Sequence, residues 1–143
     1  MPADEKKSVL VVDDDITIRK LVSHHLKINN YNVHSAANPE EAFTDLDKNH
    51  VDIVLCDISM DKMDGFEFCE IVRRNEKFRS TPFVFISAKN TIEDKSKALE
   101  VGGDDYITKP FNVDELMLKV KSMIRRTEIN RIYGGRKNIQ GNP

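Results

Sequence analysis

The sequence predicts an α/β fold, a single doubly wound parallel sheet of five strands with five helices covering its two faces. Short apolar runs and longer amphipathic segments alternate five times along the 143 residues. The apolar runs are continuous and do not alternate with polar residues, which is typical of parallel strands buried on both faces. Carboxylates directly follow two of these runs, where open α/β sheets carry their functional residues.

The first half of the chain contains two strands and two helices. Val9–Val12 is an apolar run that ends in three aspartates, and Ile16–Asn30 has helical periodicity. Tyr31–Ala36 is a more polar strand, suited to a sheet edge. The next helix starts at Asn38–Glu41, where Asn can cap, Pro tolerates the first turn and the acids favour the positive end of the helix dipole.

The second half repeats this alternation around a central strand, Ile53–Cys56, which ends in Asp57. A helix follows, opened by Asp64 as a capping residue. The remaining elements are a strand over 82–86, a helix over 91–101 stopped by two glycines, a strand over 105–107 and a last helix from Asn112.

Composition and charge narrow the class of protein. Hydrophobic residues make up 39% and charged residues 32%, as in a globular protein with a core, and the net charge is −2. We therefore expect no membrane contact and no direct nucleic-acid binding by this domain. Cys56 and Cys69 lack CxxC spacing, and the first residues lack a secretory signal. Both observations favour a cytoplasmic protein with reduced core thiols.

Three aspartates at strand ends predict a metal site. Asp13 and Asp14 follow one strand and Asp57 another, so the carboxylates converge if these strands are neighbours. Two bare carboxylates about 4 Å apart repel by roughly 4 kcal/mol at an effective dielectric of about 20. A compensating cation is needed, and an oxygen-only ligand set suits Mg²⁺. Asp15 is instead expected to cap the helix that follows it.

Two later residues complete the candidate site. Ser87 and Lys109 each come just after or at the end of a later strand. Lys109 precedes Pro110, which biases its backbone away from helix. Its charge can meet Asp57 or a phosphoryl group on Asp57, while Ser87 supplies a hydroxyl.

This ordered set resembles the receiver domain of two-component response regulators. An acid pair, an aspartate, a serine and Lys-Pro follow strands one, three, four and five, and the run Gly102–Phe111 is similar to the family's own. The resemblance implies a flavodoxin-like fold with strand order 2-1-3-4-5. It divides the chain into a polar leader (1–7), a receiver domain (8–127) and a basic tail or truncated linker (128–143). Asp61 departs from the family's usual Pro in its loop.

The resemblance also implies a mechanism. Asp57 accepts a phosphoryl group from a phosphohistidine on a sensor histidine kinase or a histidine phosphotransfer protein. Asp14 binds Mg²⁺ directly, Asp13 supports it through water, and the backbone carbonyl of Ser59 completes the protein ligands. The ion and Lys109 stabilise charge on the transferring oxygens. No enzyme activity is implied beyond self-phosphorylation and self-dephosphorylation.

Signalling is expected to run through Ser87 and Tyr106. The resemblance implies that Ser87 follows the new phosphoryl oxygens and that the ring of Tyr106 moves with it. The face made by the fourth helix, fifth strand and fifth helix then switches and supports a phosphorylation-dependent homodimer. On that face the acids Asp104 and Asp105 lie between basic helices, so a twofold partner could pair opposite charges.

An enzyme is the alternative interpretation. Asp13–Thr17 also fits the D-x-D-x-T start of haloacid-dehalogenase-type phosphatases, in which Asp13 would be the nucleophile. That interpretation leaves Asp57 without a role and offers no cap insertion. A third possibility is a degenerate receiver that binds partners without being phosphorylated, but the complete set of acids, hydroxyl and Lys argues against it.

Overall fold

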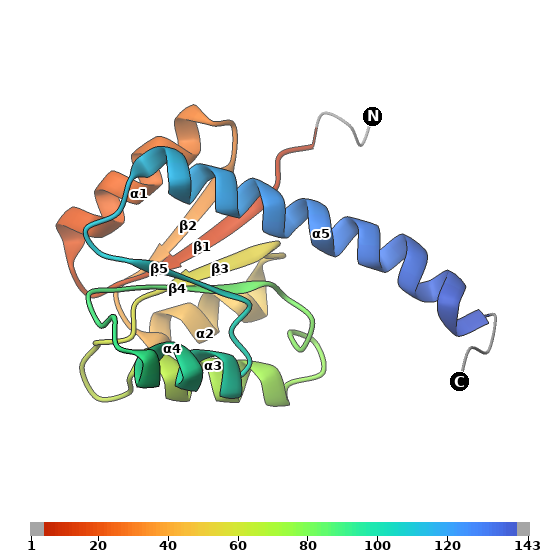
Figure 1. Cartoon of the computed structure of the whole chain (residues 1–143). Coiled ribbons are helices and arrows are strands. Elements are labelled where there is room, and N and C mark those ends of the chain that lie inside the picture. Colours follow the sequence, from red (N-terminus) through yellow and green to blue (C-terminus); the bar gives the residue numbers. More distant parts are fainter. Residues whose placement is uncertain (1–4, 140–143) are drawn as a thin grey trace.

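The described part of the chain, residues 5–139, forms one sheet of five parallel strands with helices on both faces (Figure 1). In this computed structural model the side chains are described as far as Tyr133. The strand order is β2-β1-β3-β4-β5, which confirms the predicted fold class and places β2 at an edge. The strands are β1 Ser8–Val12, β2 Asn32–Ala36, β3 Ile53–Cys56, β4 Phe83–Ser87 and β5 Asp105–Thr108.

Helices α1 and α5 cover one face of the sheet, and α2, α3 and α4 cover the other (Figure 1). The helix starts follow the predicted caps. The side chains of Asp15, Asn38 and Asp64 each accept a backbone N–H from the first turn of the helix that they precede. The helices are α1 Ile16–Ile28, α2 Pro39–Lys48, α3 Gly65–Arg74, α4 Ile92–Glu100 and α5 Val113–Ile139.

Alternate residues of the central strands fill two separate cores. In β3, Val54 and Cys56 pack under α2 and α3, while Ile53 and Leu55 pack under α1 and α5. All four side chains are fully buried. Burying an aliphatic side chain of this size stabilises the fold by about 1.5–3 kcal/mol, so β3 is a rigid support for the residue that follows it.

Helix α5 is longer than its contact with the sheet. Its buried residues end with Met123 and Ile124, and residues 128–133 are all exposed. The helix continues without a break to Ile139 and projects past the edge of the sheet at which β1 begins (Figure 1). Residues 128–139, which were expected to belong to a tail or linker, are therefore helical and continue α5. The domain boundary at residue 127 remains a prediction.

Hydropathy along the helices bears on the expected lack of membrane contact. Within residues 5–139, no helix combines the length and the apolar character that crossing a bilayer demands.

Candidate phosphoacceptor site

Two neighbouring strands bring the three predicted carboxylates together. Val12 and Cys56 are paired in the sheet, so Asp13 and Asp57 leave β1 and β3 side by side. One oxygen from each of Asp13, Asp14 and Asp57 lies within 4.8 Å of the others. Asp13 and Asp57 are only 2% and 6% exposed, whereas Asp14 is exposed. The predicted convergence of the acids is thus found in the structure.

Lys109 lies against this cluster. Its Nζ donates to Asp13 Oδ2 at 2.9 Å and lies 3.5 Å from Asp57 Oδ2. The position follows from the pairing of β4 with β5, since the N–H of Lys109 donates to the Ser87 carbonyl at 2.8 Å just beyond the paired strand ends. The Lys109 side chain is 17% exposed, so its charge is largely withdrawn from water and acts on the two carboxylates.

The local environment shifts the titration of both partners. Burial raises the pKa of Asp57, and the nearby charge of Asp13 raises it further, although Lys109 and the N–H of Ile58 act in the opposite direction. Burial by itself would lower the pKa of Lys109, but its hydrogen bond to Asp13 and the charge of Asp57 outweigh burial, so this pKa is raised. The site therefore favours the protonated form of Lys109 and disfavours the ionised form of Asp57.

Ser87 and Tyr106 meet at the loop between β4 and α4. Ser87 is buried at the end of β4, and its Oγ accepts the N–H of Lys89 at 3.2 Å. The Tyr106 hydroxyl donates to the backbone carbonyl of Lys89. Burial raises the pKa of Tyr106, and a hydrogen bond with Ser87 partly offsets that rise. The structure thus links Ser87 to Tyr106 through one loop residue.

The ligand types at the cluster fit a hard cation. The three converging groups are all carboxylates, and hard ions such as Mg²⁺ prefer oxygen ligands with open positions for water. The exposed Asp14 leaves such positions on the solvent side. Ser59 is exposed in the loop after Asp57 and its N–H contributes to holding the Asp57 carboxylate. Its carbonyl as a metal ligand remains a prediction.

Two further residues shape the site and were not singled out from the sequence. A Cβ on Gly65 would lie 2.2 Å from the backbone oxygen of Asp57, so only glycine allows this approach. The Gly65 N–H donates to the Ile58 carbonyl at 2.8 Å, which closes the loop. Arg19 Nη1 donates to the Asp13 carbonyl at 2.7 Å. Sequence spacing gives a signal for Arg19, which is one turn into the helix after the acids, but none for the Gly65 contact.

Comparison with known families places the chain in a class. Residues 9–121 match the family described as the response regulator receiver domain. The chain belongs to this family, the phosphorylated signalling domains of two-component systems. This is a signalling fold and not a recognised enzyme family, so the phosphatase interpretation finds no support.

Individual relatives are similar over most of this chain. The nisin biosynthesis regulatory protein NisR of Lactococcus lactis is 42% identical over 123 residues, which are 86% of this chain and 52% of the relative. The probable transcriptional regulator ycf27 of Cyanophora paradoxa is 38% identical over 86% of this chain and 50% of its own. The chain thus spans about half the length of these relatives.

A solved structure shows the same fold at full length. The chemotaxis protein CheY4 of Vibrio cholerae superposes with a TM-score of 0.80 at 34% identity, covering 83% of this chain and 99% of that one. The superposition therefore includes nearly all of that protein and leaves part of this chain unmatched.

Proposed function

We propose that Asp57 accepts a phosphoryl group from a phosphohistidine on a sensor histidine kinase or a histidine phosphotransfer protein. The contact of Lys109 with both Asp13 and Asp57, beside the exposed Asp14, is the observation that carries the proposal. This arrangement holds a nucleophilic carboxylate, a cation for the incoming oxygens and a ligand set for Mg²⁺ at one open edge of the sheet.

The transfer uses the carboxylate of Asp57 as nucleophile. An Asp57 oxygen bonds to phosphorus while the P–N bond breaks, and the imidazole leaves with that electron pair. Lys109 lies 3.5 Å from Asp57 Oδ2, so a small shift lets its ammonium group bind a phosphoryl oxygen. Asp13, Asp14 and the Ser59 carbonyl would hold Mg²⁺, which when bound neutralises charge on the transferring oxygens.

Phosphorylation then acts on the loop between β4 and α4. The phosphoryl group adds about −1.5 to −2 charges beside Ser87, whose hydroxyl can donate to it. If the Ser87 side chain turns toward the phosphoryl group, its oxygen leaves the N–H of Lys89. The loop that contains Lys89, which Tyr106 also contacts, is then displaced. Of the described residues in α4, Ala98 is the one that is buried, so this helix can shift with little loss of packing.

The switched face would support a homodimer, and the acids expected to pair with a second copy have partners within the chain. Asp104 and Asp105 are already bound within the chain, to Arg73 at 2.9 Å and to Lys119 at 3.1 Å. We propose instead that apolar side chains anchor the second copy. On α4 and α5 these are Ile92, Leu99 and Leu118, which are 82%, 67% and 66% exposed.

The domain limits and location belong to the same proposal. Residues 8–127 would form the receiver domain and 128–143 would lead away from it. Two relatives that are about twice as long support this division, one named a probable transcriptional regulator and the other a biosynthesis regulatory protein. Cys56 and Cys69 are both free and buried, in keeping with a reducing, cytoplasmic setting.

Phosphorylation with a small donor tests the assignment of the nucleophile. Wild-type protein incubated with acetyl phosphate and Mg²⁺ should gain one phosphoryl group that is stable in acid and labile in base, seen by intact-mass spectrometry. Asp57→Asn should remove it. If Asp13→Asn removed the group while Asp57→Asn kept it, the phosphatase-like chemistry would replace this proposal.

A further inference from the structure

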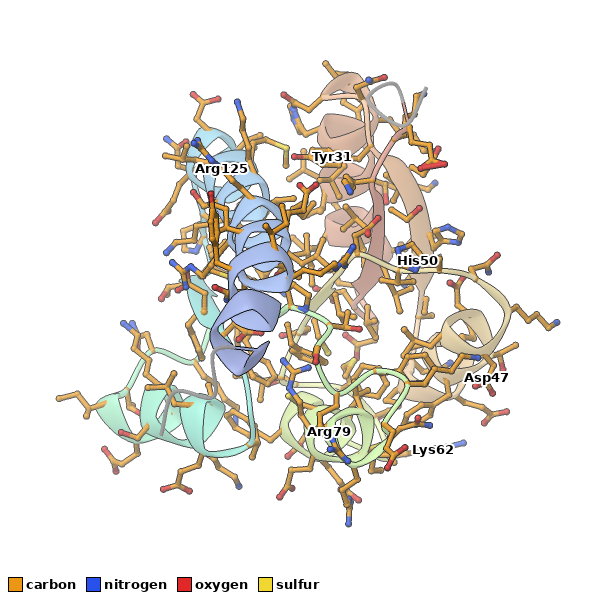
Figure 2. All side chains as sticks on the ribbon, turned by 90° about the vertical axis from the view of Figure 1, so that its right-hand side faces the viewer. Tyr31, Asp47, His50, Lys62, Arg79 and Arg125 are labelled. Atoms are coloured by element: carbon orange, nitrogen blue, oxygen red, sulfur yellow. The ribbon has the colours of Figure 1, made fainter. Side chains whose placement is uncertain are left out.

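The amino end of helix α4 is exposed and is capped by its own residues. Residues 88–93 are all exposed, and the side chain of Ile92 is 82% exposed. The cap is internal to the helix, because the side chains of Thr91 and Asp94 each accept the backbone N–H of the other residue. The helix also lies at the outer end of the layer formed by α2, α3 and α4 (Figure 2). The cap therefore stabilises the start of α4 without binding it to the sheet.

The carboxyl end of α4, by contrast, is packed against the sheet and α3. Ala98 is 3% exposed, and its carbonyl accepts the N–H of Gly103 at 2.8 Å. A Cβ on Gly103 would lie 2.6 Å from the ring of Phe85, so the backbone here lies directly on β4. The carbonyl of Val101 accepts the thiol of Cys69 in α3 at 3.5 Å. The two ends of one short helix are thus held very differently.

Arg73 of α3 binds the segment that follows α4. Its Nε donates to the Gly102 carbonyl at 2.9 Å, and its Nη2 donates to Asp104 Oδ2, also at 2.9 Å. Its Nη1 donates to the Thr81 carbonyl and to two further carbonyls of the loop before β4. Asp104 Oδ2 in turn accepts the N–H of Phe83 at 2.8 Å. The guanidinium group, on a side chain that is 18% exposed, therefore joins the end of α4 to the start of β4.

We propose that α4 is hinged at its carboxyl end, with Arg73 as the residue that holds the hinge, and that phosphorylation displaces its amino end. This inference rests on the proposed phosphoacceptor function. Ser87 and Tyr106 both contact Lys89 in the loop before α4, so a change at either side chain acts on the exposed end. Movement of the carboxyl end would instead leave the Arg73 guanidinium and the carbonyls that it binds without partners, which is costly for groups withdrawn from water.

Such a movement would separate the roles of two exposed apolar residues of α4. Ile92 is the first residue of the helix, whereas Leu99 lies beside the buried Ala98. Phosphorylation would change the position of Ile92 relative to Leu118 of α5, while Leu99 would keep its place. Ile92 is then the apolar contact of the proposed homodimer that depends on phosphorylation.

Amide hydrogen exchange of the full 143-residue chain tests the hinge, first without phosphorylation. The N–H of Lys95 is bonded in the first turn of α4, and that of Phe68 is bonded at the equivalent position of α3. The protection factor of Lys95 should be lower by about tenfold or more than those of Phe68 and Gly103. Equal protection of Lys95 and Gly103 would overturn the hinge by itself and would leave the phosphoacceptor function standing.

Beryllofluoride with Mg²⁺ then locates the movement. Exchange should change by about tenfold or more within 88–95 and by less than about twofold within 101–104. Changes of equal size at the two ends would show that α4 moves as a whole and would overturn the inference. A response at no amide would contradict the phosphoacceptor function, and the hinge would fall with it.

Matched variants test the role of Arg73. Arg73→Lys keeps the charge, but an ammonium group cannot bind Gly102, Asp104 and the loop carbonyls together. It should lower the protection of Gly103 by about tenfold and extend the response to beryllofluoride into 101–104. Arg74→Lys, at the exposed next position of α3, is the control and should change neither. A response of Arg73→Lys that stays at the amino end would exclude Arg73 as the residue that holds the hinge.

A milder variant decides the question if Arg73→Lys does not fold. Asp104→Asn removes the ion pair with Arg73, while the amide oxygen can still accept the N–H of Phe83. It should also lower the protection of Gly103 and extend the response to beryllofluoride into 101–104. Asp105→Asn, which instead loses its ion pair with Lys119 of α5, is the control. Equal effects of the two substitutions would overturn the inference.

Discussion

The surroundings of Asp57 disfavour its ionised form. Burial and the nearby charge of Asp13 raise the pKa of Asp57. Lys109 lowers this pKa, but by less than the other two effects raise it. A carboxyl group whose pKa is raised on folding contributes stability that is complete below its unfolded pKa and is lost as the pH rises through the folded pKa. The apo fold thus retains this group for reactivity at the expense of stability.

Replacing Asp57 with Asn should therefore stabilise the apo protein at neutral pH. The variant no longer buries this charge, so its free energy of unfolding at pH 7 without Mg²⁺ should exceed that of the wild type. The difference should shrink as the pH falls through the raised pKa and should level off below the unfolded pKa of about 3.9, where Asp57 is protonated in both states. Urea unfolding across this pH range measures it. A difference that grows at low pH would contradict the direction of the shift.

Replacing Asp14 with Asn should remove the response to Mg²⁺. In the wild type, Mg²⁺ binds the folded state and should raise the melting temperature, by about 2.7 kcal/mol of stability at a concentration a hundredfold above Kd. The variant should show no rise, yet be no less stable without the ion, because a repulsive charge has gone. Asp15→Asn is the matched control, since Asn can keep the cap and the three clustered acids remain. A normal Mg²⁺ response in Asp14→Asn would exclude Asp14 as a ligand.

At the scale of elements, the loop between β3 and α3 depends on one close backbone approach. The start of α3 packs directly on the backbone of Asp57 and Ile58, with no space for a side chain at Gly65. Because β3 is fully buried, the strand cannot retreat from an added atom. The loop is therefore the part of the site most sensitive to a small substitution.

Gly65→Ala should destabilise the protein and slow phosphorylation. The added methyl group meets the Asp57 oxygen, and overpacking of this kind costs about 1–3 kcal/mol. Relief of the overlap moves the Asp57 backbone, so the rate of phosphorylation by acetyl phosphate should fall even where the variant is folded. Thermal unfolding and intact-mass kinetics measure both. Ser96→Ala, at an exposed position of α4, is the control and should change stability by less than about 0.5 kcal/mol.

At the scale of the whole molecule, the two edges of the sheet carry different features. The carboxyl edge carries the acids, Ser87 and Lys109. The amino edge lies beside the projecting part of α5, which faces the viewer in Figure 2. The sheet thus separates the candidate phosphoacceptor site from the projecting helix.

The homodimer should depend on the exposed apolar residues of α4. With beryllofluoride and Mg²⁺ at about 100 μM protein, the wild type should approach a dimer by light scattering, and the double variant Ile92→Ser, Leu99→Ser should associate at least tenfold more weakly. Its phosphorylation should be unchanged. The control is Ile16→Ser, Ile28→Ser, which removes comparably exposed side chains from α1. If the activated wild type stays monomeric, the homodimer is excluded and this surface would instead bind a different protein.

Local sequence patterns were sufficient to predict the fold class and to select the residues of the candidate site. A continuous apolar run such as Ile53–Cys56 can bury all its side chains only if helices cover both faces of its strand. The acids at the ends of such strands then lie close together if the strands are neighbours. The caps Asp15, Asn38 and Asp64 were likewise predictable, because capping involves residues only a few positions apart.

Contacts between distant segments could be found only in the folded chain. The contact of Gly65 with Asp57 and the binding of Asp104 by Arg73 depend on how α3 and the loops lie on the sheet, which no local pattern encodes. The acids expected to face a partner are consequently bound within the chain.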